Sequence, residues 1–278
     1  MSADGPPGPR IDTTKPSPAR MYDYWLGGKD NLAVDREAGD KVEAANPEVR
    51  QLVVANRQFL VRAVRFLAEE GIDQFIDIGT GLPTSPNVPE VARAVHPQAR
   101  VVGVDNDPIV IVHSRALVSV NEGLTTIEGD LREPDQILDN PELRALIDLD
   151  RPVAVLVSAV LHFIRDEEDP AGIVARIAEH LAPGSYVMIS SVTSTGIPSE
   201  ILERIEQVYR RSTSPAVARP EDQILAWFDR LNMVDPGVVD VVDWRPYLQE
   251  FLPAPGLLVW PQDLRTTYRI VGGVAQKP

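Results

Sequence analysis

The stretch FIDIGTG at residues 75–81 decides the fold. Its apolar, β-branched beginning predicts a buried strand that runs directly into a Gly-x-Gly turn. Glycines let backbone amides approach a ligand that a Cβ would exclude, and α/β sheets bind ligands at the carboxyl ends of their strands. We therefore predict a ligand site here, with Asp77, Gly79, Thr80 and Gly81 as contacts. A tight strand-to-helix turn without a ligand is the alternative explanation of the glycines.

The residues after this turn distinguish between classes of cofactor. A dinucleotide fingerprint needs a third glycine at position 84, where this chain has Thr84. An adenosyl ligand without phosphates does not need that close approach. Asp77, just before the first glycine, also disfavours a diphosphate and suits a cationic or hydroxyl-bearing ligand. The turn therefore favours an adenosyl cofactor without phosphates over NAD.

Outward from the turn, short β-branched runs alternate with helical segments from about residue 71 onward. The apolar runs are nearly continuous, as expected of parallel strands buried on both faces. Asp107-Pro108 and Asp169-Pro170 each combine a capping carboxylate with proline at the first helical position. Val238–Val242 and Tyr268–Val274 predict two final strands and an antiparallel end to the sheet. The pattern predicts an α/β, Rossmann-like sheet that is mostly parallel, with helices on both faces.

Two further acids follow the next two strands. Asp105 ends VVGVD, at about the distance where a carboxylate meets ribose hydroxyls in a βαβ unit. The alternative is a helix cap, but Asp107 already fills that role and leaves Asp105 free. Asp130 follows the third strand, where its carboxylate could accept from an adenine amino group while the Leu131 amide meets a ring nitrogen. Two more residues at strand ends complete the predicted contacts: Asn106 and Ser158.

The N-terminal part of the chain predicts three helices. A short helix carries the aromatic residues Tyr22, Tyr24 and Trp25, a glycine break follows, and a second helix begins at about Asp35. Pro47 opens a long helix that Gly71 ends. The apolar residues of this long helix recur at three- and four-residue spacing. Its arginines are expected on other faces: Arg50, Arg57, Arg62 and Arg65.

These patterns divide the chain into a disordered tail at 1–15, a helical lid segment at 16–70 and a Rossmann-like domain at 71–278. A lid of aromatic, glycine and charged residues can exclude water and hold one end of a ligand. Tyr22 is the first expected contact from the lid, and Arg20 is the second. The alternative is that the aromatic residues only dock the helix on the core.

His162 is the histidine with a candidate catalytic role, because it follows the fourth strand in SAVLHF. Its neutral imidazole could take a proton from a hydroxyl group. The alternative is a packed, hydrogen-bonded core histidine. The four histidines show no metal-ligand spacing, and no metal is indicated.

Composition excludes several classes of function. The 278 residues are 44% hydrophobic, carry a net charge of −14 and include no cysteine. The charge argues against a sequence-independent grip on nucleic acid, and the missing cysteine excludes disulfides and thiolate sites. No apolar run approaches the roughly 20 residues of a membrane span, and no secretion signal is recognisable. A cytoplasmic protein without a membrane partner is expected.

Six stretches carry a family resemblance: PSPARMYDYWLGGKDN, FIDIGTGLPTSPNVPEVA, VVGVDNDPIVIVHSRAL, VLVSAVLHFI, DPAGIV and LAPGSY. With the acids at three strand ends, the chain resembles class I S-adenosylmethionine-dependent methyltransferases. Among these it is similar to the actinobacterial S-adenosyl methyltransferase family, formerly a domain of unknown function. The resemblance covers nearly the whole chain from about Pro16. It implies a seven-stranded sheet with an antiparallel last strand, S-adenosylmethionine at residues 77–81, and N-terminal helices folded over the cofactor.

The resemblance implies a methyltransferase but supplies no acceptor. The chain lacks the Asp/Asn-Pro-Pro-aromatic sequence that nucleic-acid amino methyltransferases carry after the fourth strand. With the acidic composition, this favours a small-molecule acceptor over DNA or RNA. A non-catalytic protein that senses S-adenosylmethionine is the alternative, and an NAD-dependent oxidoreductase is disfavoured by Thr84. The oligomeric state stays open, with a homodimer among the options.

Overall fold

The computed structural model describes residues 12–118, 122–251 and 264–278. The predicted tail at 1–15 therefore lies mostly outside the described residues. Within these ranges, no helix is long and apolar enough to cross a membrane.

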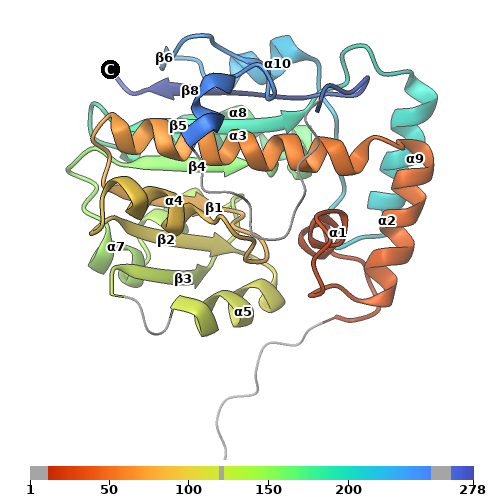
Figure 1. Ribbon diagram of the computed structural model, residues 1–278, viewed down its shortest axis with the longest axis horizontal. Coiled ribbons are helices and arrows are strands. Elements are labelled where there is room, and N and C mark those ends of the chain that lie inside the picture. Colours follow the sequence, from red (N-terminus) through yellow and green to blue (C-terminus); the bar gives the residue numbers. More distant parts are fainter. Residues whose placement is uncertain (1–11, 119–121, 252–263) are drawn as a thin grey trace, which may run out of the picture.

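A mixed sheet forms the centre of the molecule, in the order β3-β2-β1-β4-β5-β8-β6 (Figure 1). The first five strands in this order run parallel, and β8 runs antiparallel to β5. The predicted parallel sheet with an antiparallel last strand is confirmed. The sheet has eight strands and not seven, because the unpredicted two-residue strand β6 pairs with β8. Strand β7, which also pairs with β8, lies within the predicted strand Val238–Val242. The strands are β1 (Gln74–Ile78), β2 (Arg100–Asp105), β3 (Leu124–Glu128), β4 (Ala154–Ser158), β5 (Tyr186–Val192), β6 (Asn232–Met233), β7 (Val239–Asp240) and β8 (Ile270–Gln276).

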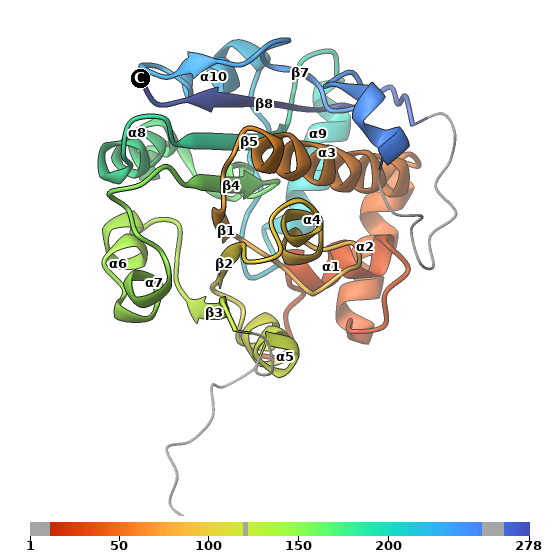
Figure 2. The ribbon, with the colours of Figure 1, turned by 60° about the vertical axis from the view of Figure 1, so that its left-hand side comes forward.

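Helices cover both faces of the sheet, as predicted (Figure 2). Helices α3 and α4 lie on one face, and α6, α7 and α8 lie on the other. Helices α1 and α2 stand at the carboxyl ends of the parallel strands, where α2 packs beside α9 (Figure 1). The helices are α1 (Pro18–Trp25), α2 (Ala33–Ala45), α3 (Val49–Glu69), α4 (Val88–Val95), α5 (Pro108–Val118), α6 (Pro134–Leu138), α7 (Pro141–Leu146), α8 (Pro170–His180), α9 (Ser199–Tyr209) and α10 (Glu221–Ala226). Short helices α6 and α10 were not predicted.

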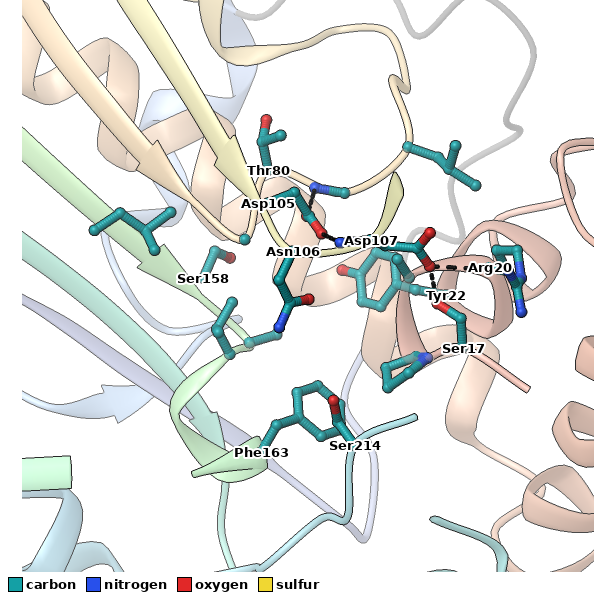
Figure 3. Close-up of a pocket in the computed structure, with 18 of the residues that line it drawn as sticks. Ser17, Arg20, Tyr22, Thr80, Asp105, Asn106, Asp107, Ser158, Phe163 and Ser214 are labelled. Carbon is teal, nitrogen blue, oxygen red and sulfur yellow. Dashed lines mark hydrogen bonds and ion pairs between the residues drawn. The ribbon is translucent and has the colours of Figure 1, made fainter. Parts of the chain in front are cut away.

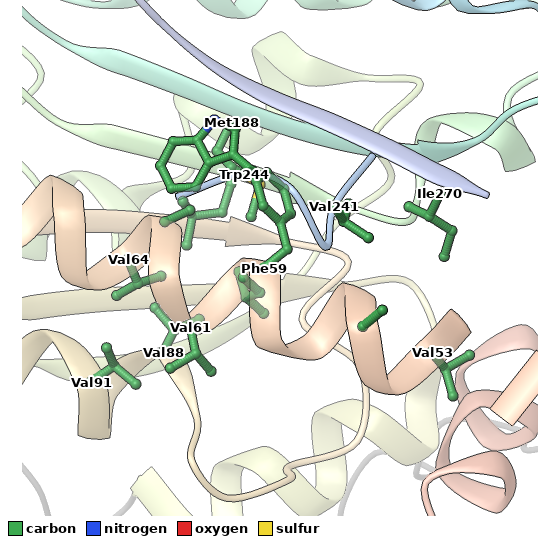
Figure 4. Packing of buried hydrophobic residues seen from close by; sticks show 14 of the residues in the cluster. Val53, Phe59, Val61, Val64, Val88, Val91, Met188, Val241, Trp244 and Ile270 are labelled. Atoms are coloured by element: carbon green, nitrogen blue, oxygen red, sulfur yellow. The ribbon is translucent and has the colours of Figure 1, made fainter. Parts of the chain in front are cut away.

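The long helix α3 is a core element of the fold. It carries Phe59, whose ring meets the buried Trp244 edge-on at 5.4 Å (Figure 4). The ring of Phe66, on the same helix, meets Trp244 edge-on at 5.8 Å. Strand β8 approaches α3 closely at Gly272, where a Cβ would lie 2.7 Å from Cε1 of Phe59. The structure therefore divides the predicted lid segment, because α1 and α2 cover the strand ends while α3 covers the sheet.

Two arginines of α3 are buried, although the apolar spacing placed them on other faces. Arg62 is 1% exposed, and its guanidinium donates to the carbonyls of Trp244 at 2.9 Å and Val241 at 2.5 Å. Burial lowers the pKa of Arg62 to about 10. Arg57 is 9% exposed and faces the strand ends. Both arginines are buried because α3 is covered nearly all round by the sheet, α4 and the C-terminal segment.

Candidate functional site

A cavity of about 440 Å³ opens at the carboxyl ends of strands β1 to β4. Its volume lies in the range of small-molecule sites. Helices α1 and α3 close the side that faces the strand ends, and Figure 3 shows Tyr22 and Ser17 approaching Asp105 and Asp107 across the cavity. Every residue that the sequence predicted for the site lines this cavity: Arg20, Tyr22, Asp77, Gly79, Thr80, Gly81, Asp105, Asn106, Asp130, Leu131, Ser158 and His162.

The two glycines of the turn have different structural roles. Gly79 and Gly81 both adopt left-handed backbone conformations, with φ of 73° and 66°. A Cβ on Gly79 would lie 2.2 Å from Cγ2 of Val160, so this glycine lets the turn pack against the loop after β4. A Cβ on Gly81 would meet nothing within 4 Å, because this glycine borders the cavity. The second glycine therefore leaves open the space that a ligand needs.

The carboxylate of Asp105 is held by two backbone amides. Gly81 N–H donates to Oδ2 at 2.9 Å, and Asp107 N–H donates to Oδ1 at 2.9 Å. The expectation that Asp105 is free was wrong in this respect, although each oxygen keeps a lone pair for a ligand hydroxyl. Burial raises the pKa of Asp105 to about 6, against the two amide bonds that lower it. A donor from a ligand would therefore stabilise its ionised form.

Asp107 caps α5, as predicted, by accepting from Ile109 N–H at 2.9 Å. Its other oxygen accepts from the Ser17 hydroxyl at 2.5 Å and lies 3.9 Å from Nη1 of Arg20. Arg20 also forms a buried ion pair with Asp35 at 2.8 Å. Arg20 therefore fastens α1 to α2 and to the turn after β2, with its head group occupied by protein partners.

Asp130 already has protein donors around its carboxylate. Nη1 of Arg132 donates to both of its oxygens, at 2.9 and 3.1 Å, and Nδ2 of Asn106 donates at 3.2 Å. Arg132 is shared with Glu168 at 2.7 Å. An adenine contact at Asp130 and Leu131 stays a prediction, and it requires the Asn106 or Arg132 donor to release an oxygen of Asp130.

A buried hydrogen-bond network joins the lid to the ends of β4 and β5. Nδ2 of Asn56 donates to the Tyr22 hydroxyl at 3.1 Å and to the Ser158 hydroxyl at 3.2 Å. The Ser190 hydroxyl donates to Oδ1 of Asn56 at 2.6 Å and accepts from Ala159 N–H at 3.0 Å. Ala159 has a φ of 56°, which is strained for a residue with a Cβ. The network therefore holds the turn after β4 in position beside the cavity.

Sequence reasoning missed Asn56 and its neighbour Arg57. Both lie in α3, which separates them from the Gly-x-Gly turn in the sequence but not in space. The available signal was the polar run Asn56-Arg57-Gln58 inside an otherwise apolar stretch of helix, and α3 buries all three residues.

His162 lies in a short 3-10 turn after β4 and is 7% exposed. Its Nδ1 has no hydrogen-bond partner among the described residues, and its ring packs 4.3 Å from that of Phe163. Burial, and secondarily the nearby charge of Arg219, lower the pKa of His162 to about 3. The imidazole is therefore neutral at physiological pH, and its protonation is strongly disfavoured.

The side of the cavity away from the Gly-x-Gly turn is formed by aromatic, aliphatic and hydroxyl-bearing side chains. The rings of Phe163 and Tyr209 lie 5.6 Å apart, and Figure 3 shows Ser214 close to Phe163. Burial raises the pKa of Tyr209, so its hydroxyl stays protonated. Six residues form this uncharged wall: Phe163, Val192, Tyr209, Thr213, Ser214 and Ile270. Among the residues that the structure describes, no cluster of histidine and acidic side chains is arranged to hold a metal ion.

Comparison with known families and structures shows which proteins this chain is similar to. A family model described as S-adenosyl methyltransferase matches residues 4–278. A DUF574 family protein from Streptomyces avermitilis is 41% identical, covers 97% of this chain and 100% of its own, and superposes with a TM-score of 0.85. A protein from Thermobifida fusca, described as a candidate methyltransferase, is 37% identical, covers 99% of both chains and has a TM-score of 0.85.

More distant structures share the fold alone. An O-methyltransferase family protein from Burkholderia thailandensis is 12% identical, covers 92% of this chain and 69% of its own, and has a TM-score of 0.51. The comparison with curated proteins gives no match.

Proposed function

Because this chain belongs to the S-adenosyl methyltransferase family, we propose that it methylates a small organic acceptor bound in the cavity at the strand ends. One observation carries the proposal. The main cavity has acidic strand ends on one side and an uncharged wall of aromatic, aliphatic and hydroxyl-bearing residues on the other. The first side suits the adenosyl group of S-adenosylmethionine, and the second suits an acceptor without charge.

The strand-end residues have the chemistry to hold the cofactor. Asp105 offers lone pairs to the ribose hydroxyls, and its amide bonds from Gly81 and Asp107 fix its direction. Gly81 leaves room for the ligand above the turn. When bound, S-adenosylmethionine supplies an electrophilic methyl carbon on its sulfonium sulfur. The chain's contribution is to orient the acceptor toward that carbon and to exclude water.

His162 is proposed to orient the acceptor. Its imidazole is neutral at physiological pH and can accept a hydrogen bond from an acceptor hydroxyl or amine. Complete proton transfer to this ring is unfavourable because burial and Arg219 destabilise the imidazolium. We therefore expect His162→Gln to weaken acceptor binding more than it lowers the rate of transfer at saturation.

Nucleic acid is not the proposed acceptor, since a net charge of −14 opposes approach to phosphates. We further propose a cytoplasmic location, which the absence of cysteine supports.

The test is turnover in a mixture of metabolites. Purified protein is incubated with S-adenosylmethionine and an extract of small molecules, and S-adenosylhomocysteine is measured by mass spectrometry. We expect S-adenosylhomocysteine together with a product that is heavier by one methylene than an extract component. Cofactor binding without turnover across broad extracts would instead support a protein that senses S-adenosylmethionine.

A further inference from the structure

Arg57 is a buried cation without an anionic partner. It is 9% exposed, and Nη2 donates to the carbonyls of Thr84 at 2.5 Å and Pro86 at 2.8 Å. Its Nε is buried and has no hydrogen-bond partner among the described residues. Burial lowers the pKa of Arg57, against the attraction of Tyr22 and Asp77. The guanidinium is held in place by neutral carbonyls and still lacks a counter-charge.

Two other buried arginines of this chain, Arg20 and Arg219, are partnered differently from Arg57. Arg20 pairs with Asp35 at 2.8 Å, and Arg219 pairs with Asp166 at 2.7 Å. Within the described ranges, no carboxylate lies within 4.0 Å of the Arg57 guanidinium. Burying an unpaired charge is costly, and folds normally offset it with an ion of opposite sign. A ligand carboxylate would supply that ion, and Arg57 lines the cavity.

Asp77 lies on the same side of the cavity and carries the opposite charge. Its Oδ2 accepts from the Thr80 hydroxyl at 2.7 Å, and burial raises its pKa while the charge of Arg57 lowers it. Both residues line the main cavity and also a smaller one of about 70 Å³ under residues 80–84. A group that carries a carboxylate and an ammonium together would match Arg57 and Asp77 at once.

We infer that Arg57 binds the carboxylate of the methionine end of the cofactor, with Asp77 facing its ammonium group. This inference rests on the proposed placement of the cofactor at the strand ends. The position of Arg57 favours the cofactor over the acceptor as the source of the carboxylate. Arg57 borders both cavities beside the Gly-x-Gly turn, whereas Phe163 and Tyr209 of the uncharged wall border only the larger one.

The experiment compares two ligands that differ by the carboxylate alone. Calorimetry measures the affinity of wild type, Arg57→Gln and Arg57→Lys for S-adenosylmethionine and for its decarboxylated form. Arg65→Gln is the matched control, since Arg65 lies on the same helix and pairs with Glu69 at 2.9 Å outside the cavity. Wild type and the Arg65→Gln variant are expected to prefer the carboxylate ligand by roughly 10- to 100-fold, as for a hydrogen-bonded charge pair.

The Arg57→Gln variant should lose this preference while it retains its affinity for the decarboxylated ligand. Arg57→Lys should keep part of the preference, because it keeps the charge but not the planar fork. An equal loss of both ligands would mean that Arg57 only holds the loop at Thr84 and Pro86, and it would overturn the inference.

An unchanged preference of Arg57→Gln for S-adenosylmethionine over its decarboxylated form would overturn the inference as well. That result, together with a raised KM for an acceptor that carries a carboxylate, would place Arg57 at the acceptor and not at the cofactor. If wild type binds neither ligand, the proposed function fails, and this outcome is distinct from binding without a change in preference.

Discussion

The two sides of the cavity are built in different ways. The strand-end side places Asp77, Asp105 and Asp130 at the ends of β1, β2 and β3, where the register of a parallel sheet brings them together. The opposite side is assembled from α1, α3, the turn after β4 and the segment after α9. Its network joins Asn56 to Ser158 and Ser190, across 102 and 134 residues of sequence.

The first side is therefore determined by local backbone structure, and the second by contacts between distant segments of the chain. Two backbone amides hold Asp105, and the nearby Thr80 hydroxyl holds Asp77, so their geometry depends on the turn conformation and the sheet. The helix side depends on side chains that contact one another across distant segments. We expect mutations of the first side to affect the cofactor. Mutations of the second side should affect the acceptor and the stability of the lid, except at Arg57, which we infer to contact the cofactor.

The largest effect is expected at Gly79. Gly79→Ala adds left-handed strain of about 1–2 kcal/mol and a clash with Val160 of about 1–3 kcal/mol, so the free energy of unfolding should fall by roughly 2–5 kcal/mol. Gly81→Ala adds only the strain, but its methyl group enters the cavity and should weaken cofactor binding. Urea denaturation and calorimetry measure the two effects. Equal losses of stability in the two variants would contradict the assignment of Gly79 to packing and of Gly81 to ligand space.

The next largest effect is expected at Arg62. Arg62→Met removes the donors to the carbonyls of Trp244 and Val241 and leaves these acceptors buried. The free energy of unfolding should fall by roughly 2–3 kcal/mol. The control is Arg65→Gln on the same helix, where an exposed i,i+4 pair with Glu69 contributes below about 0.5 kcal/mol. A similar loss in both variants would show that α3 is held by its helix propensity and not by these carbonyls.

Cofactor affinity should depend on pH through Asp105. Its pKa of about 6 lies above the ordinary value of 3.8, so protonation of the folded chain removes a ribose acceptor as the pH falls through 6. Below that pH, the Kd of S-adenosylhomocysteine should rise by up to about tenfold per unit. The stability of the cofactor-free protein should depend on pH in the opposite direction, because the folded chain binds the Asp105 proton more tightly than the unfolded chain does. The free energy of unfolding should therefore fall as the pH rises from about 4 to about 6.

Asp105→Asn is the control for this pH dependence, because it cannot titrate. The raised pKa of Asp77 acts in the same direction, so the part of the profile that persists in this variant belongs to Asp77. An unchanged profile in Asp105→Asn would show that Asp105 does not face the ligand.

The smallest effect is expected at Ser17, on the helix side. Ser17→Ala removes the bond from its hydroxyl to Asp107, which should cost about 0.5–1.5 kcal/mol. Amide hydrogen exchange in α1 should become faster, while exchange in β1 and β2 stays unchanged. Slower or equal exchange in α1 would show that this bond does not fasten the lid.

Sequence reasoning reached the strand-end side because local patterns determine it. A buried strand, a Gly-x-Gly turn and an acid after each of three strands are all visible in short windows, and all of the residues predicted from them line the cavity. The hydrogen-bond partners of these residues could not be predicted from the same short windows of sequence. Asp105 was expected to be free, yet Gly81 and Asp107 donate to it, because the turn curls back over the end of β2.

The helix side was predicted only in part. Tyr22 was found from its aromatic neighbours. Asn56 and Arg57 were not found, because the apolar spacing in α3 suggests a helix with one solvent-exposed face. That reasoning fails when a helix is covered by a sheet, another helix and a distant segment at once. Strand β6 was not predicted, since two residues carry no periodic signal, whereas β7 lies within the predicted strand Val238–Val242.

Calorimetric titration of Asp105→Ala with S-adenosylhomocysteine tests the central claim most directly. Asp73→Ala is the matched control, because Asp73 pairs with Arg151 at 3.1 Å on the surface. The account predicts that loss of the ribose carboxylate weakens binding by about 1.5–3 kcal/mol, or roughly 10- to 150-fold in Kd, while the control binds like wild type. An unchanged affinity in Asp105→Ala would contradict the placement of the cofactor at these strand ends.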